Sequence, residues 1–124
     1  MTAFTLDTGA LIALERRRQR MRHVLDLAVA DEITVVVPSV CVAEWWRGRS
    51  DQREAILHGM VVEHTDDVLV RLAGEAQAQI AGATCIDAIV MASAARRGGV
   101  VFTSDVADLQ RLQAVFPSVR VLGV

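Results

Sequence analysis

The sequence predicts an α/β fold, a three-layer α/β/α sandwich in which helices cover both faces of a central parallel sheet. Short β-rich runs alternate along the chain with longer segments of helical periodicity. The clearest strand, residues 33–37, is an unbroken run of β-branched residues, as expected of a parallel strand buried on both faces. The chain has 124 residues, 52% of them apolar, which suits one compact domain over residues 1–124.

The first elements are a strand and two helices. Residues 4–6 form a short apolar strand that ends at Asp7. Residues 8–9 turn the chain, and the apolar run 10–14 starts a helix. Apolar residues recur at helical spacing over 21–28, which predicts a second helix after an arginine-rich stretch.

The strand at residues 33–37 is followed by two helices and another strand. Pro38 is tolerated in a first helical turn, so a helix is expected over 39–47 and should end at Gly48. Ser50 is a suitable cap for a short helix that reaches residue 57. Residues 60–63 form a short peripheral strand.

The second half of the chain continues the alternation. Residues 65–67 combine a helix cap with acids in the first turn, which predicts a helix to about residue 80. The segment 82–84 breaks that helix. The remaining elements are a helix from residue 84 or 85 to 97, a strand over 100–103, a helix from residue 104 or 105 to 115 and a strand over 119–122.

Composition and charge exclude several classes of protein. No apolar run reaches the roughly 18 residues that a membrane span needs, and the N-terminal residues lack the pattern of a signal peptide, so a cytoplasmic protein without a membrane partner is expected. Cys41 and Cys85 have no ligand spacing and are expected to be buried, reduced thiols. All 13 basic residues are arginine, although the net charge is only −2. The arginines within 16–22 suit phosphate recognition, or they form a solvated helix face.

Five acidic residues follow predicted strands or begin predicted helices: Asp7, Glu44, Asp87, Asp105 and Asp108. Parallel sheets place ligands beyond the carboxyl ends of their strands. Several of these acids sit among apolar residues, where a lone carboxylate would be desolvated and a group of them would repel one another. A divalent cation resolves both problems, and hard carboxylate oxygens suit Mg²⁺ or Mn²⁺.

Each acid also has a purely structural interpretation. Asp7 could serve only as a turn residue or helix cap, and Asp105 only as a cap. Asp87 could be present because an acid near a helix start is favourable. Glu44 could pair with Arg47 or Arg49.

Four segments resemble the PIN-domain family, and together they span essentially the whole chain in the family's order. They are residues 6–14, 42–44, 86–94 and 101–109. Short PIN proteins of this kind are typically VapC ribonuclease toxins of type II toxin–antitoxin pairs. The resemblance implies that Asp7, Glu44, Asp87 and Asp105 are the catalytic, metal-binding acids and that Asp108 is an auxiliary one. It places hydroxyl groups near the site, from Thr8, Thr103 and Ser104.

The function implied by the resemblance is a Mg²⁺- or Mn²⁺-dependent endoribonuclease that cleaves RNA such as tRNA or another structured RNA. It also implies a VapB-like antitoxin as partner and a homodimer. The alternative is a PIN-like RNA- or partner-binding module without a toxin role. Contacts to RNA or antitoxin are expected from Arg16, Arg17, Arg47, Arg49, Trp45 and Trp46. The alternative for Trp45 and Trp46 is that one or both belong to the core, since large aromatic side chains are mostly buried. Two other acidic-site classes fit poorly, because a receiver domain needs a lysine that the chain lacks and a haloacid-dehalogenase-type phosphatase needs a second acid shortly after Asp7.

Overall fold

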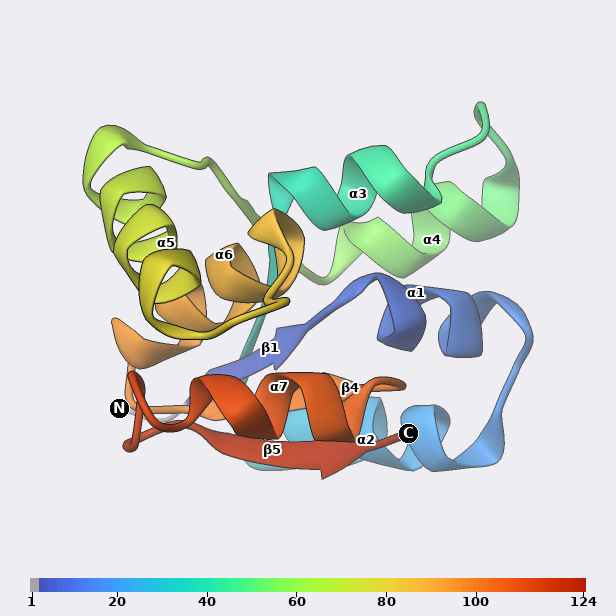
Figure 1. Ribbon diagram of the computed structural model, residues 1–124. Helices are drawn as coiled ribbons and strands as arrows, with labels where there is room; N and C mark the ends of the chain where they lie inside the picture. The colour runs from blue at the N-terminus through green and yellow to red at the C-terminus, as the bar shows by residue number, and fades with distance from the viewer. Residues whose placement is uncertain (1–2) are drawn as a thin grey trace.

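Five parallel strands form the centre of the protein, whose computed structural model describes residues 3–124 (Figure 1). The strand order is β3-β2-β1-β4-β5, and every neighbouring pair is parallel. The order therefore reverses beside β1, which pairs with both β2 and β4. The strands are β1 (Ala3–Leu6), β2 (Thr34–Pro38), β3 (Val61–Glu63), β4 (Val100–Thr103) and β5 (Arg120–Gly123).

Seven helices connect and flank the strands within the described residues. The side chains of Asp7, Ser50, Asp66 and Thr84 each accept a backbone N–H hydrogen bond at the start of a helix, which explains why these helices begin there. The helices are α1 (Thr8–Glu15), α2 (Gln19–Ala30), α3 (Ser39–Trp45), α4 (Asp51–His58), α5 (Asp67–Gln79), α6 (Cys85–Ala95) and α7 (Val106–Leu112).

The predicted elements are all present, but three helices end earlier than expected. α3 ends at Trp45 because the backbone is extended at Trp46, so Arg47 and Gly48 lie in a loop. α6 ends at Ala95 and α7 at Leu112.

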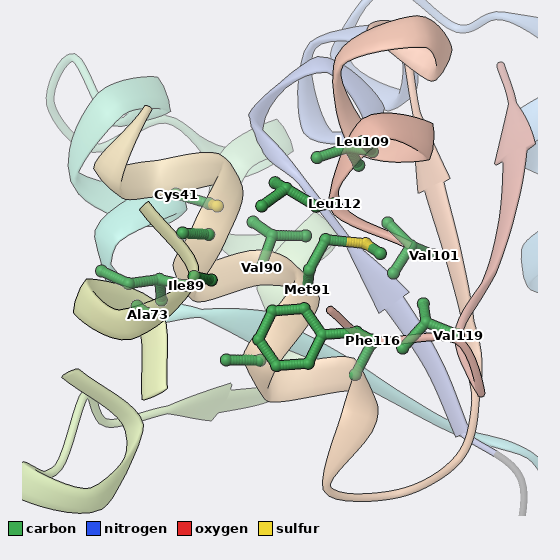
Figure 2. Close-up of a cluster of buried hydrophobic side chains, with 14 of the residues drawn as sticks. Cys41, Ala73, Ile89, Val90, Met91, Val101, Leu109, Leu112, Phe116 and Val119 are labelled. Atoms are coloured by element: carbon green, nitrogen blue, oxygen red, sulfur yellow. The ribbon is translucent and has the colours of Figure 1, made fainter. Parts of the chain in front are cut away.

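Two apolar layers hold the helices against the sheet. One buried cluster is built from α3, α5, α6 and α7, and the other from α1 and α2. β4 contributes to both because its side chains alternate between faces: Val101 joins the first cluster, whereas Val100 and Phe102 join the second. Figure 2 shows the first cluster, in which α6 and α7 side chains meet the sheet: Ile89, Val90, Met91, Leu109, Leu112 and Val101.

A polar network fixes α6 to the end of β3. Ser93, which is fully buried, donates a hydrogen bond to Glu63 at 2.6 Å, and Arg97 forms an ion pair with the same carboxylate. These contacts hold the helix that carries Asp87 in register with the sheet.

A second network joins α1, α3 and α4. Trp45 donates its indole N–H to Glu15 at 3.0 Å, and Arg53 pairs with Glu15 at 2.9 Å. The helix that carries Glu44 is therefore fixed to α1, which it contacts. None of the helices described between residues 3 and 124 has the length and apolar character that crossing a membrane requires.

Candidate active site

All five predicted acids line one pocket of about 460 Å³ at the carboxyl end of the sheet. β1 leads directly to Asp7 and β4 leads to Asp105, so two acids follow the neighbouring strands at which the strand order reverses. Ligands of open parallel sheets bind at this kind of position. The pocket is lined by Asp7, Thr8, Gly9, Glu44, Thr84, Cys85, Ile86, Asp87, Asp105 and Asp108.

Asp7 is the most buried of the five acids, with 5% of its surface exposed. One carboxylate oxygen accepts the Ala10 N–H at 2.9 Å, and the other accepts the hydroxyl of Thr103. The pKa of Asp7 is raised from 3.8 to about 6, chiefly by burial and also by the nearby charges of Asp105 and Asp87, although the hydrogen bonds from Thr103 and Ala10 act to lower it. The helix-cap interpretation of Asp7 is thus realised, and the same carboxylate still lines the pocket.

Thr103 joins two of the acidic positions. Its fully buried hydroxyl donates to Asp7 and accepts the backbone N–H of Asp105 at 2.9 Å. The Asp105 side chain forms no capping hydrogen bond with α7. The capping alternative for Asp105 is therefore not realised, and its exposed carboxylate is free to serve the pocket.

Glu44 contacts a hydroxyl instead of an arginine. Thr8 donates a hydrogen bond to Glu44 at 2.5 Å, which links the start of α1 to the last turn of α3. Arg49 pairs with Asp51, at 3.4 Å, and with Glu54. Arg47 donates to a backbone carbonyl. The ion-pair alternative for Glu44 is therefore not realised among residues 3–124.

Asp87 lies half-buried in the first turn of α6, where its N–H donates to the cap residue Thr84 at 3.1 Å. Burial raises its pKa above the ordinary value, and the charges of Asp105, Asp108 and Glu44 act in the same direction. The acids therefore repel one another across the pocket. In the described part of the chain no arginine lines this pocket to offset that repulsion.

The donor set fits a hard divalent cation. It consists of carboxylate oxygens, which suit such an ion. The raised pKa values of Asp7 and Asp87 mean that their ionised forms are destabilised in this pocket. Between residues 3 and 124, no three acid, histidine or cysteine side chains already converge as a ready-made ligand group. The contacts explain this, because both oxygens of Asp7 have protein donors and Glu44 is turned to Thr8. Only one oxygen of Glu44 accepts the Thr8 hydroxyl, so its other oxygen has no protein donor among the described residues.

The remaining predicted site residues divide between rim and core. Ser104 is exposed, and it packs so closely on Gly9 that a β-carbon there would lie 2.0 Å from its hydroxyl oxygen. Arg16 lines a second hollow together with residues of α1 and α2. Arg17 lines a third hollow, along α2. Trp45 is buried, which favours the core over a contact role, whereas Trp46 is half-buried and stacks edge-on against it.

The prediction for the two cysteines was half wrong. Cys41 is buried as expected, but Cys85 is exposed and lies on the rim of the acid pocket. Cys85 is the first residue of α6, directly after the cap residue, and the first turn of this helix faces the pocket instead of the core. The usual burial of free cysteine, on which the prediction was based, therefore does not hold at this position.

No family model and no curated protein sequence matches the chain. Solved structures share its fold over nearly its whole length. VapBC2 from Rickettsia felis, bound to a promoter DNA fragment, matches with a TM-score of 0.79 at 13% identity and covers 99% of each chain. DNA-bound VapBC from Salmonella typhimurium matches with a TM-score of 0.73 at 20% identity, over 99% of this chain and 98% of that one. FitAcB from Neisseria gonorrhoeae matches at 0.65 and 18% identity over 96% of each chain. The expected PIN-like three-layer fold is thus confirmed.

Proposed function

We propose that the chain is a VapC-type, metal-dependent endoribonuclease that cleaves RNA in the acid pocket. The observation that carries the proposal is the meeting of five carboxylates from distant parts of the sequence in one pocket beyond β1 and β4. Mutual repulsion makes such a pocket unfavourable unless a cation occupies it. Its position, at the reversal of strand order, is where this class of sheet binds ligands.

The acids of the pocket would have different roles, depending on how deeply each of them is buried. Asp7 is fixed by Thr103 and the Ala10 N–H, so it is suited to hold the cation in one place. Glu44, Asp105 and Asp108 are exposed, and one of these carboxylates can accept the proton that the attacking water releases. Bound Mg²⁺ or Mn²⁺ would supply the Lewis acid that activates water and neutralises charge on the attacked phosphate. Unpaired RNA suits this site better than a duplex does, because its bases and backbone can be splayed into a pocket.

Partners follow by analogy with structures of the same fold. The similar structures are VapBC and FitAB assemblies, so the proposal includes a VapB-like antitoxin and a homodimer of this chain. Co-expression with the product of a neighbouring short reading frame, followed by light scattering, would measure both. A free monomer that neither forms a complex nor dimerises would contradict this part of the proposal.

The central test is dication-dependent RNA cleavage. The purified chain should cut single-stranded RNA in Mn²⁺ or Mg²⁺, and EDTA should stop it. Asp7→Asn should abolish cleavage while the fold survives, whereas Asp31→Asn, an exposed change of the same charge, should leave it intact. Full activity of Asp7→Asn, or RNA binding without any cleavage in the wild-type chain, would favour the binding-module alternative.

A further inference from the structure

A second hollow, of about 590 Å³, adjoins the acid pocket and has the opposite charge. Arg16, Arg18 and Arg20 line it, and no acidic residue does among those described. Ile12 and Ala13 supply apolar surface on the α1 side. We call the hollow that these arginines line the arginine hollow.

The arginines of this hollow lack carboxylate partners within the described range. None of the ion pairs of residues 3–124 involves Arg16, Arg18 or Arg20. Only Arg20 makes a side-chain hydrogen bond, to the Gly123 carbonyl at 2.7 Å. Elsewhere, arginines such as Arg53 and Arg97 are paired with glutamates. Clustered guanidinium groups without acids repel one another and favour an anionic ligand.

Gly9 is the wall between the two hollows, because it lines both of them. Ser104, on the arginine side, is followed directly by Asp105 on the acid side. The lack of a side chain at Gly9 lets Ser104 pack against α1, so the wall between the hollows is only one residue thick at this point. The acid pocket and the arginine hollow therefore lie on either side of Gly9, so a ligand chain that crosses Gly9 would reach from the acids to the arginines.

We propose that the arginine hollow binds the phosphates that flank the cut bond of an RNA strand. This proposal rests on the proposed function, since it assigns the strand's neighbouring phosphates once one phosphate lies at the acids. Guanidinium groups form paired hydrogen bonds with phosphate oxygens. The apolar surface of Ile12 and Ala13 suits the sugar or base that separates successive phosphates. An acidic polypeptide is the competing occupant, but it gives no reason for the arginine hollow to lie directly beside a pocket of carboxylates that suits a phosphate-bound cation.

Salt dependence of RNA binding tests this assignment without using cleavage. The variant Arg16→Gln/Arg18→Gln removes two charges from the hollow. The control Arg71→Gln/Arg120→Gln also removes two charges, from exposed arginines that line neither the arginine hollow nor the acid pocket. Both are made in the Asp7→Asn background, with a labelled single-stranded oligouridylate as probe and poly-L-glutamate as a second probe.

The expected result is a change in slope. Each lost phosphate contact on a single strand reduces the slope of log affinity against log salt by about 0.7. The slope of the test variant should therefore be smaller by about 1.4, and its RNA affinity at low salt should be about tenfold weaker. The control should keep the slope of the Asp7→Asn background.

An unchanged slope in the test variant, with wild-type RNA cleavage present, would overturn the phosphate assignment and leave the nuclease proposal standing. A reduced slope in the test variant, with no RNA cleavage by the wild type, would support the phosphate assignment and contradict the nuclease proposal. Dependence on Arg16 and Arg18 for polyglutamate but not for RNA would also overturn it, in favour of a polypeptide.

Discussion

The hydroxyl of Thr103, at the end of β4, donates a hydrogen bond to the carboxylate of Asp7, at the end of β1. The same hydroxyl accepts the Asp105 N–H at 2.9 Å. One buried side chain therefore fixes the relative positions of two acids that are almost the whole sequence apart. Strand pairing brings the two strand ends together, and this hydroxyl sets the finer geometry.

Thr103→Val should reveal the cost of losing that hydroxyl. Valine has nearly the same shape, but it leaves a buried oxygen of Asp7 without its donor and the Asp105 N–H without its acceptor. We expect a loss of about 1–3 kcal/mol in the free energy of unfolding. The dication concentration for half-maximal activity should also rise. Urea unfolding and a Mn²⁺ titration of RNA cleavage measure the two effects.

Thr103→Ser is the matched control, because it keeps the hydroxyl and removes only a methyl group, worth about 0.8 kcal/mol. Equal stability of the valine and serine variants would show that the hydrogen bonds contribute little.

The raised pKa of Asp7 predicts that stability falls as pH rises in the absence of dications. The folded state holds this proton more tightly than the unfolded chain, with a pKa of about 6 against 3.8. Its stabilising effect is therefore complete below pH 4 and is lost between about pH 4 and 6. The effect is at most about 3 kcal/mol. Asp87, whose pKa is also raised, contributes in the same direction.

Asp7→Asn isolates this contribution, since asparagine cannot ionise. In EDTA the variant should be more stable than the wild type at pH 7.5, and the difference should shrink at pH 4. Added Mn²⁺ should restore stability to the wild type by binding only the folded state. Chemical unfolding at both pH values checks this, and a wild type more stable than Asp7→Asn at pH 7.5 without dication would contradict it.

Glu44 should matter for the cation and little for the fold. It is exposed, and its hydrogen bond to Thr8 lies at the surface, so Glu44→Gln should change the unfolding free energy by no more than about 0.5 kcal/mol. Loss of one charged ligand should weaken Mn²⁺ binding at least about tenfold. Glu54→Gln, an exposed glutamate outside the pocket, is the control. Calorimetric Mn²⁺ titration distinguishes them, and equal affinities in the two variants would remove Glu44 from the ligand set.

The sequence predicted the sheet because strands depend on local patterns of apolar and β-branched residues. It also placed Asp7 directly after one strand and Asp105 two residues after another, which is where the structure has them. The parts that it missed depend on contacts between distant residues. Nothing near Glu44 in the sequence indicates Thr8 as its partner, and nothing near Cys85 shows that its helix begins at a pocket rim.

The arginines illustrate the same limit. Their clustering at 16–22 is visible in the sequence, but the connection between α1 and α2 and the first turn of α2 divide them between two hollows. Arg47 and Arg49 are predicted from the sequence to contact RNA or antitoxin, as Arg16 and Arg17 are. In the structure, both form local contacts in the loop after α3. Neither lines the acid pocket or the arginine hollow.

The contact between Gly9 and Ser104 predicts an unusual response to a mild substitution. Alanine in place of glycine normally stabilises a helix by about 1 kcal/mol. Here the new β-carbon would lie 2.0 Å from the Ser104 hydroxyl oxygen and 2.8 Å from its β-carbon, so α1 must shift away from the end of β4. We therefore expect Gly9→Ala to destabilise the protein by about 1–3 kcal/mol and to impair cleavage, because the shift moves Asp7 relative to Asp105.

Ser104→Gly removes both atoms that clash, so the double variant Gly9→Ala/Ser104→Gly should recover most of the stability lost in Gly9→Ala. A double-mutant cycle by urea unfolding measures this coupling, which should exceed about 1 kcal/mol because the two residues are in direct contact. Gly74→Ala is the control for intrinsic helix propensity, since nothing lies within 4 Å of a β-carbon there. Additive effects of the two single changes would mean that the wall between the acid pocket and the arginine hollow is not held by this contact.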